Sequence, residues 1–216
     1  MNNKNIETYF NELAKDWSSR YKNSTFFRQR YNEFNELLTI YSDVNVVALD
    51  YGCGSGVLTE LLAKKAGTVI GTDISIKMQQ VASNELSEHS NITISEIEAI
   101  EENYYDLVIC SSVIEYAEKD TDLLIKLSTY LKSNGILIIT FPNRYGIFQL
   151  YNKYILSKIK ANSYIDFQKN IYIKSTIKSK LKVAGFNLEK LHTHVGFPHL
   201  SKIGFGELFF CVARKK

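Results

Sequence analysis

The sequence predicts an α/β protein in which a mostly parallel, doubly wound sheet carries helices on both faces. Between residues 44 and 141, short apolar runs alternate with helical patterns of about ten residues, which is typical of β-α-β crossovers. The 216 residues are 45% hydrophobic and 23% charged, which suits one globular domain with a core and is too short for two full-sized domains. We therefore expect a single domain over residues 1–216.

The first 40 residues predict a helical cap that precedes the sheet. Apolar and aromatic side chains recur at helical spacings around Tyr9 and Trp17, and again from Phe26 to Leu38, so two helices are expected. Residues 1–10 are polar and lack the apolar segment of a secretory signal, and no apolar run reaches the length of a membrane span. With three cysteines, an odd number, these features favour a cytoplasmic protein.

Five apolar runs predict the first strands of the sheet, because buried parallel strands are continuously apolar. Two of these runs end in an acidic residue, Asp50 and Asp73. The expected elements are a strand at 44–50, a helix at 57–66, a strand at 68–73, a helix at 76–86, strands at 91–94 and 106–110, a helix at 122–132 closed by Asn134-Gly135, and a strand at 136–141.

After Pro142 the pattern changes. Residues 143–175 are aromatic and basic without a clean strand, and we expect them to form a lid inserted after the fifth strand. A helix at 177–184 and alternating strands at 188–195 and 207–213 should complete the sheet.

The most informative stretch is Asp50-Tyr51-Gly52-Cys53-Gly54-Ser55-Gly56. Alternate glycines let the backbone turn tightly out of a strand and let a ligand approach main-chain atoms. The following helix directs its N-terminal amides toward the same place, which favours a carboxylate or phosphate. Asp73 ends the next strand, where a carboxylate can accept the hydroxyls of a ribose. Together these features predict a site for a nucleoside-containing cofactor rather than a plain tight turn.

The glycine spacing and the acid indicate which cofactor is bound. A dinucleotide fingerprint is G-x-G-x-x-G, whereas this loop has G-x-G-x-G, and Asp50 would repel a pyrophosphate but suits a cation. The loop resembles the first motif of the class I S-adenosylmethionine (SAM) dependent methyltransferases, acid-x-Gly-x-Gly-x-Gly. Residues 105–116 and 131–140 resemble that family's fourth-strand and fifth-strand segments, so the resemblance covers residues 44–142.

This resemblance implies a seven-stranded, Rossmann-like sheet whose last strand is antiparallel, with SAM as the cofactor. It implies that Asp50 and the loop amides face the methionine end of SAM and that Asp73 holds the ribose. Ile74 and Met78 would pack near the adenine, Glu96 or Glu98 would meet the adenine amine, and Ser111 and Ser112 would lie near the methyl sulfur. The expected cofactor-binding residues are Asp50, Gly52, Cys53, Gly54, Gly56, Asp73, Ile74, Met78, Glu96, Ile97, Ser111 and Ser112.

Other segments are similar to small-molecule methyltransferases such as the ubiquinone-type O-methyltransferases and the magnesium-protoporphyrin methyltransferases. These are residues 141–144, Phe-Pro-Asn-Arg, together with Trp17 and Tyr21. Where the ubiquinone-type enzymes commonly have Glu-His, this chain has Glu115-Tyr116, so a histidine base is absent there. Residues 141–144 also depart from the motif with which many base methyltransferases hold a flipped amine. The expected function is methyl transfer from SAM to an oxygen or nitrogen of a small-molecule acceptor, with an anionic or membrane-associated acceptor favoured by the basic second half of the chain.

Candidate catalytic residues come from outside the glycine loop. His192 and His194 lie on one face of a predicted strand, either as a base for the acceptor or as two imidazoles on a half-exposed face, and no metal site is expected. Tyr21 either caps the cofactor's carboxylate or packs within the helical cap. Arg28 and Arg30 either pair with an anionic acceptor or are solvated.

The net charge of +3 hides an uneven distribution. Residues 1–120 hold 10 basic and 19 acidic side chains, and residues 121–216 hold 16 and 4. Residues 144–182 carry nine lysines or arginines and one acid among aromatic side chains, which fits a solvated basic face, contact with anionic lipid or substrate, or nucleic acid. The alternative function is therefore a non-enzymatic basic adaptor that binds a membrane or RNA through residues 144–182, and a nicotinamide dehydrogenase is a third.

Overall fold

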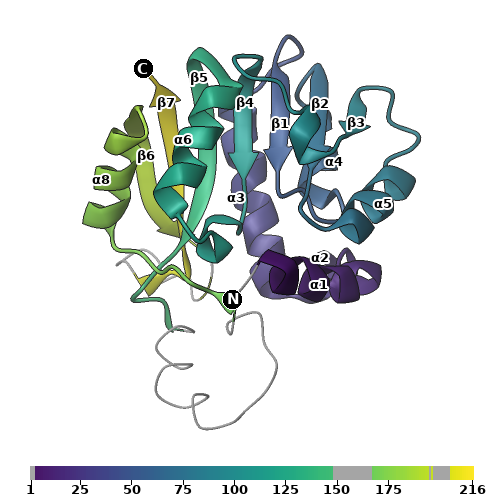
Figure 1. Cartoon of the computed structure of the whole chain (residues 1–216), viewed down its shortest axis with the longest axis horizontal. Coiled ribbons are helices and arrows are strands. Elements are labelled where there is room, and N and C mark those ends of the chain that lie inside the picture. Colours follow the sequence, from purple (N-terminus) through teal and green to yellow (C-terminus); the bar gives the residue numbers. More distant parts are fainter. Residues whose placement is uncertain (1–2, 148–166, 195, 197–204) are drawn as a thin grey trace, which may run out of the picture.

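A computed structural model describes residues 3–147, 167–194, 196 and 205–216, and these residues form one seven-stranded sheet with the order β3-β2-β1-β4-β5-β7-β6 (Figure 1). β1 to β5 run parallel to one another, and β7 runs antiparallel to both β5 and β6. The predicted fold class, with its antiparallel last strand, is confirmed. The strands are β1 (Val47–Tyr51), β2 (Thr68–Thr72), β3 (Ile92–Ile94), β4 (Tyr105–Cys110), β5 (Leu131–Pro142), β6 (Phe186–His194) and β7 (Leu208–Lys215).

Helices cover both faces of the sheet. β4 shows how its residues divide: Leu107 and Ile109 pack with α3 and α4, while Val108 and Cys110 pack with α6 and α8. Successive side chains of a strand point to opposite faces, so a continuously apolar strand is buried on both. The helices are α1 (Asn3–Leu13), α2 (Ser19–Asn23), α3 (Thr25–Tyr41), α4 (Val57–Ala63), α5 (Ile76–Glu85), α6 (Asp120–Tyr130) and α8 (Lys174–Val183), with short 3-10 turns η1 (Ala14–Asp16), η2 (Ile97–Ala99) and η3 (Ile114–Tyr116).

Two predicted boundaries differ from the structure for local reasons. The first strand begins at Val47 rather than at residue 44, because the residues before Val47 form a turn. In this turn the Asp43 carboxylate accepts a hydrogen bond from the Asn45 amide, and the Asp43 carbonyl accepts one from the Val46 amide. The helix predicted over 122–132 ends at Tyr130. Leu131 already pairs with Tyr105 of β4 and is fully buried, so Asn134-Gly135 lies inside β5 rather than closing a helix.

The helical cap has three α-helices rather than two, because Ser24 adopts an extended conformation and separates α2 from α3. α1 and α2 lie across the carboxyl ends of the parallel strands (Figure 1). Asn11 of α1 fastens this cap, since its side-chain oxygen accepts hydrogen bonds from the Ser75 hydroxyl (2.7 Å) and the Lys77 amide (3.2 Å) at the start of α5. The carboxyl ends of β1 and β2 are therefore enclosed by the N-terminal residues.

Most of the predicted lid, residues 148–166, lies outside the described residues. Its two ends are described and meet beside β5, where the Arg144 amide donates to the Tyr172 carbonyl and the Tyr172 amide donates to the Pro142 carbonyl. Among the helices of the described residues, none is long and apolar enough to cross a bilayer.

Asp120 connects α6 to α8 and to Tyr172. Its carboxylate accepts hydrogen bonds from the Tyr172 hydroxyl (2.8 Å) and the Lys180 ammonium (2.7 Å). Burial opposes ionisation, but these two donors hold the pKa of Asp120 below its usual value. Asp120→Ala takes the acceptor away from the buried Tyr172 hydroxyl and leaves the Lys180 ammonium with the Thr121 hydroxyl (3.1 Å) in place of an ion pair, and we expect it to lower the free energy of unfolding by about 2–4 kcal/mol.

Urea unfolding at pH 7 measures this difference. Asp122→Ala is the matched control, because Asp122 lies in the same first turn of α6 and is exposed. We expect the control to change stability by less than about 0.5 kcal/mol. Equal effects of the two substitutions would contradict the assignment of Asp120 as a structural anchor.

Candidate functional site

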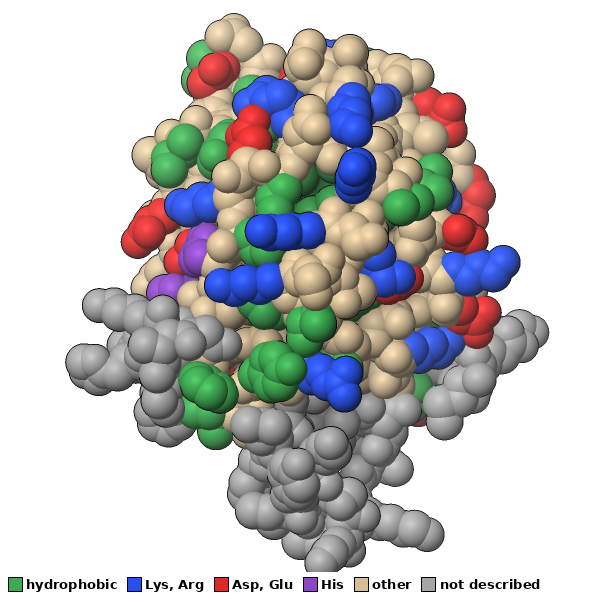
Figure 2. All heavy atoms as spheres, turned by 90° about the vertical axis from the view of Figure 1, so that its left-hand side faces the viewer, with side chains coloured by type: hydrophobic (Ala, Val, Ile, Leu, Met, Phe, Trp, Pro, Cys, Tyr) green, Lys and Arg blue, Asp and Glu red, His purple; other side chains and the backbone are tan. Residues whose placement is uncertain are grey.

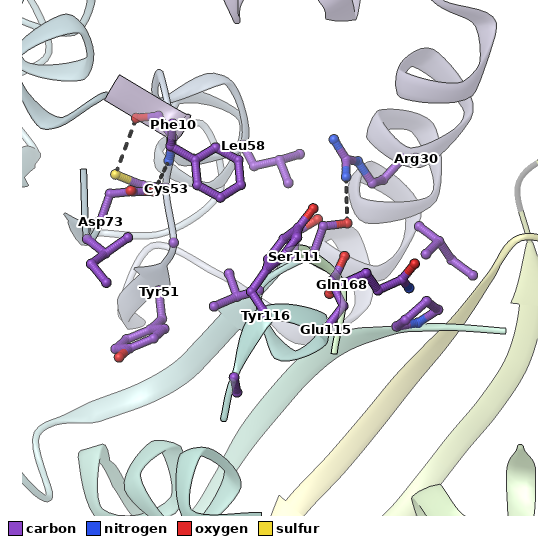
Figure 3. A pocket seen from close by; sticks show the side chains of 18 of the residues that line it. Phe10, Arg30, Tyr51, Cys53, Leu58, Asp73, Ser111, Glu115, Tyr116 and Gln168 are labelled. Atoms are coloured by element: carbon purple, nitrogen blue, oxygen red, sulfur yellow. Dashed lines mark hydrogen bonds between the residues drawn. The ribbon is translucent and has the colours of Figure 1, made fainter. Parts of the chain in front are cut away.

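A cavity of about 890 Å³ opens at the carboxyl ends of β1 and β4, where the strand order reverses and ligands of α/β sheets usually bind (Figure 3). Asp73 and Cys53 lie at one end, and Arg30, Ser111 and Glu115 lie at the other. Of the residues predicted from the sequence, those lining it are Tyr21, Asp50, Gly52, Cys53, Gly54, Asp73, Ile74, Met78, Ile97, Ser111 and Ser112. Gly56, Glu96, His192 and His194 do not line it.

The glycine loop is fixed to the end of β2 by its own amides. The Thr72 carbonyl accepts hydrogen bonds from the amides of Gly52 (2.8 Å) and Cys53 (2.9 Å), and the Gly54 amide donates to the Asp73 carboxylate (2.9 Å). These amides already have protein acceptors, which differs from the expectation that the loop amides face the cofactor. A loop of this kind does not offer the row of unpaired amides that a pyrophosphate needs.

Glycine is required at position 52 because a side chain there would collide with another segment of the chain. Its φ is +84°, and a Cβ at this position would lie 2.2 Å from Cγ2 of Val113. The absent side chain therefore lets the segment after β4 pack directly on the loop that follows β1. This contact brings Ser112 and Glu115 close to the loop. Gly56 has a different role: it adopts a left-handed conformation directly before α4, and a Cβ there would collide with the Leu86 side chain.

Asp73 sits at the carboxyl end of β2 with both oxygens oriented by the backbone. Oδ1 accepts from the Ser75 amide (2.9 Å) and Oδ2 from the Gly54 amide (2.9 Å). Burial raises its pKa although these amides pull it down. The apolar Ile74, Met78 and Ile97 line the cavity beside it. Glu96, which was predicted to meet an adenine amine, is exposed and outside the cavity lining.

Asp50 is a buried carboxylate with one unsatisfied oxygen. Oδ2 accepts a hydrogen bond from the Thr59 hydroxyl (2.7 Å), whereas Oδ1 has no partner among the described residues. Burial, with a further contribution from the charge of Asp73, raises the pKa of Asp50 to about 7. A buried carboxylate of this kind is stabilised by a cationic ligand, which agrees with the chemistry expected of the acid in the motif.

Arg30 of α3 is buried, whereas the sequence had left it open between pairing with an anionic acceptor and solvation. It is only 4% exposed. Its guanidinium donates to the hydroxyls of Ser112 (2.7 Å) and Tyr21 (3.0 Å) and lies over the Phe27 ring at 4.4 Å, and its Nε has no partner among the described residues. No carboxylate in the described part of the chain forms an ion pair with it, so the cavity holds a buried cation that an anionic group can neutralise.

Glu115 lies in η3 at the same end of the cavity. It is 6% exposed, and its Oε2 has no hydrogen-bond partner among the described residues. Burial raises its pKa to about 7, although its own amide, Arg30 and Ser112 pull it down. In the sequence it stood out only as half of an unusual Glu-Tyr pair, and its burial is a property of the fold.

His192 and His194 face α3 instead of the cavity. His192 Nε2 lies 2.5 Å from Oε1 of Glu33, and His194 Nδ1 lies 3.2 Å from Oε2 of the same carboxylate. The prediction that both rings share a face holds in this geometry, but the structure does not bring them to Ser111 and the other cavity residues. Within the described residues no group of three or more metal-ligating side chains is arranged to hold an ion. A catalytic role for these histidines stays a prediction.

The fold and the loop define a Rossmann-like domain with a nucleoside-type site. Residues 49–139 match the family described as methyltransferase domain. The predicted resemblance to the class I SAM-dependent methyltransferases is thus confirmed for these residues, which make up less than half of the chain.

Individual relatives agree with this assignment. The ubiquinone biosynthesis O-methyltransferase of Nitrosomonas europaea is 29% identical over 147 residues, which cover 62% of this chain. The chain spans 61% of that relative's length. Magnesium protoporphyrin IX methyltransferase from Synechocystis PCC 6803, solved with bound SAH, is similar in fold over 100% of both chains, with a TM-score of 0.75 and 19% identity. The [4+2]-cyclase SpnF also shares the fold over 85% of this chain and 80% of its own, with a TM-score of 0.65 and 16% identity, so the fold alone does not determine the chemistry.

The raised pKa of Asp50 predicts a pH-dependent cost to stability. The folded state binds a proton more tightly than the unfolded state, so the free energy of unfolding falls as pH rises from about 4 to about 7. Asp50→Asn keeps an acceptor for Thr59 but cannot ionise. We expect this variant to be more stable than the wild type at pH 8, by on the order of 2–4 kcal/mol, and to differ little at pH 4.5.

Urea unfolding at the two pH values, without any ligand, checks this expectation. Asp122→Asn serves as the control at an exposed carboxylate. If Asp50→Asn is destabilised equally at both pH values, ionisation of Asp50 does not cost the folded state any stability, and the prediction is wrong.

Proposed function

We propose that this protein is a SAM-dependent methyltransferase that acts on an oxygen or nitrogen of a small-molecule acceptor. The observation that carries the proposal is the presence in one cavity, within the described residues, of a buried carboxylate with an unsatisfied oxygen (Asp50) and a buried guanidinium without an ion pair (Arg30), beside a strand-end acid (Asp73). The methyltransferase-domain match and the O-methyltransferase relatives support it. The chemical class of the acceptor and the activity of the whole protein are both part of what we propose.

The opposite charges fit the amino-acid end of the cofactor, which carries both an ammonium and a carboxylate. Tyr21 links the two groups: its pKa is raised by burial and by the charge of Asp50, and lowered by Arg30, so all three lie within electrostatic reach of one another. We assign the ammonium to Asp50 and the carboxylate to Arg30 and the Tyr21 hydroxyl. Tyr21 then caps the cofactor's carboxylate, the first of the two roles that the sequence left open for it.

The other end of the cavity suits the nucleoside. The Asp73 carboxylate is held in place by two amides and retains lone pairs for ribose hydroxyls. Ile74, Met78 and Ile97 provide apolar surface for a base. The carboxylates of Asp50 and Asp73, together with the occupied loop amides, disfavour a pyrophosphate and therefore the nicotinamide alternative.

The chain's contribution to catalysis is mainly positioning and exclusion of water. When bound, SAM supplies a methyl group on a positively charged sulfur, which a nucleophile can attack in line. Ile6 and Phe10 of α1 and Trp17 line the cavity, and Phe10 packs edge-to-face on Tyr116 at 5.4 Å, so the helical cap meets the segment after β4. A closed, oriented site of this kind lowers the barrier of a two-reactant transfer.

Calorimetry with SAM and with S-adenosylhomocysteine (SAH) tests the proposal. We expect both to bind the wild type, and we expect Asp73→Ala and Arg30→Met each to weaken SAH about 10- to 100-fold, as loss of charge-assisted hydrogen bonds does. Lys178→Met, an exposed position on α8, is the control and should bind SAH as the wild type does. If neither compound binds the wild type below about millimolar concentration, the proposal is wrong.

A second candidate is contact with an anionic surface, favoured by the basic face around α8. Lysine and arginine side chains gather over the face formed by α8 and β6, with acidic side chains mostly toward its margins (Figure 2). α8 has no acidic residue, and Lys174, Lys178 and Lys182 are exposed along one side of it and form no ion pair within the described residues. Most of the remaining basic segment, residues 148–166, lies outside the described part of the chain.

Sedimentation with phosphatidylglycerol vesicles checks this candidate. We expect the wild type to sediment with the vesicles at low salt, and a variant with all three lysines changed to glutamine to lose most of that binding while keeping its affinity for SAH. Sedimentation of the two proteins to the same extent would contradict a role for α8.

A further inference from the structure

The cavity contains an ionisable group that cofactor binding does not use. Asp50, Arg30, Tyr21 and Asp73 are assigned to SAM under the proposed function, on which this inference rests. Glu115 remains, at the end of the cavity away from Asp73 (Figure 3). A buried carboxyl without a partner for one of its oxygens is costly, and such groups concentrate at functional sites.

The backbone of η3 holds Glu115 in place. Its carbonyl accepts hydrogen bonds from the amides of Lys169 (2.7 Å) and Asn170 (3.1 Å), while the Asn170 side chain donates to the carbonyls of Ile114 (3.1 Å) and Ala117 (2.7 Å). The turn is therefore clamped on both sides by the chain that leads into α8. Oε2 is buried without a partner in the described residues, and the residue lines the cavity, so a ligand group that reaches Oε2 can donate the hydrogen bond that it lacks.

The groups around Glu115 set its protonation. Arg30 of α3 is the cation that faces it, Cys110 of β4 and Tyr172 before α8 are the titratable groups within electrostatic reach, and Ser112 lies on its own segment. Burial raises the pKa of the Cys110 thiol well above its usual value and raises that of Tyr172, so both stay neutral near pH 7. Glu115 is thus the group at this end of the cavity that changes charge near neutral pH.

We propose that Glu115 accepts the proton of the methyl acceptor, and that the acceptor therefore presents an O–H or N–H rather than a carboxylate. In the step that this assigns, the acceptor proton moves to Glu115 Oε2, the acceptor lone pair forms a bond to the methyl carbon, and the carbon–sulfur bond breaks with its electron pair left on sulfur. The positive charge of the sulfonium and the negative charge of the carboxylate are both lost, so the charges balance. An acceptor carboxylate needs no base and would be repelled by an ionised Glu115.

This role takes the place of the histidine that is absent from position 116. Histidine is absent from the cavity lining in the described residues, whereas a carboxyl with a pKa near the working pH is well matched to a general base. Tyr116 instead packs against Phe10, which helps to close the cavity beside the base.

The test compares Glu115→Gln with the wild type, using Glu60→Gln as a matched control, since Glu60 is an exposed residue of α4 paired with Lys64. Binding of SAH is measured first, by calorimetry and without an acceptor. Methyl transfer from labelled SAM is then measured for a panel of phenols, each paired with a nitro-substituted analogue that is already ionised at the assay pH. We expect Glu115→Gln to bind SAH within threefold of the wild type, to lose about 10²- to 10⁴-fold in turnover of the un-ionised phenols, and to lose much less with the ionised analogues.

A readout without cofactor completes the experiment. Because the folded-state pKa of Glu115 is raised, the free energy of unfolding of the wild type should fall as pH rises from about 4.5 to about 7. It should fall less for Glu115→Gln and as in the wild type for Glu60→Gln. An identical pH dependence in Glu115→Gln would overturn the inference.

The outcomes separate this inference from the proposed function. Failure of the wild type to bind SAH refutes the proposed function itself. If SAH binds but the un-ionised and ionised phenols lose turnover equally in Glu115→Gln, or neither loses it, Glu115 is not the base. The wild type is also assayed with amines and carboxylates, and a wild type that binds SAH but methylates carboxylates only, or none of the phenols and amines, contradicts the inference.

Discussion

The hydrogen bonds between the glycine loop and the end of β2 are the constraint on which the site depends. The Thr72 carbonyl holds two loop amides and the Asp73 carboxylate holds a third, so the ends of β1 and β2 form one rigid corner. Gly52 then allows Val113 to pack on this corner, which fixes the segment after β4. Asp50 lies in β1, Asp73 directly follows β2, and Glu115 lies in η3 after β4. The corner determines the relative positions of these three residues.

The cavity concentrates charges that the fold does not neutralise. Asp50 and Glu115 each have a buried oxygen without a partner in the described chain, and Arg30 is buried with hydroxyls and aromatic rings rather than with a carboxylate. Each of these groups costs stability in the free protein. A ligand with complementary charges, such as one that carries both an ammonium and a carboxylate, recovers that cost when it binds.

The features predictable from the sequence are those encoded by local patterns. The alternating strands and helices and the Asp50–Gly56 loop each depend on residues that are near neighbours in the chain, and the antiparallel direction of the last strand followed from the family resemblance. The sequence left Arg30 open between an anionic partner and solvent, and it did not predict the burial of Arg30 or Glu115, because this burial arises when α3 and η3, far apart in sequence, meet at the cavity. The alternation at His192 and His194 correctly placed both rings on one face, but only the packing of α3 shows that this face meets Glu33. The position of Glu96 could not be predicted from local patterns either. It follows the short strand β3, whose three residues do not determine the direction of the loop that leaves it.

Trp17 gives the protein an optical property of its own. It is the chain's one tryptophan, it lines the cavity, and a Cβ on Gly54 would lie 3.1 Å from its ring nitrogen. The Arg20 guanidinium lies over the Trp17 ring, 4.5 Å from its centre. Filling the cavity replaces water beside the indole, so the tryptophan fluorescence of the protein comes from a single side chain at the cavity. Ligand entry and release can thus be followed in real time in the unlabelled, unmodified chain.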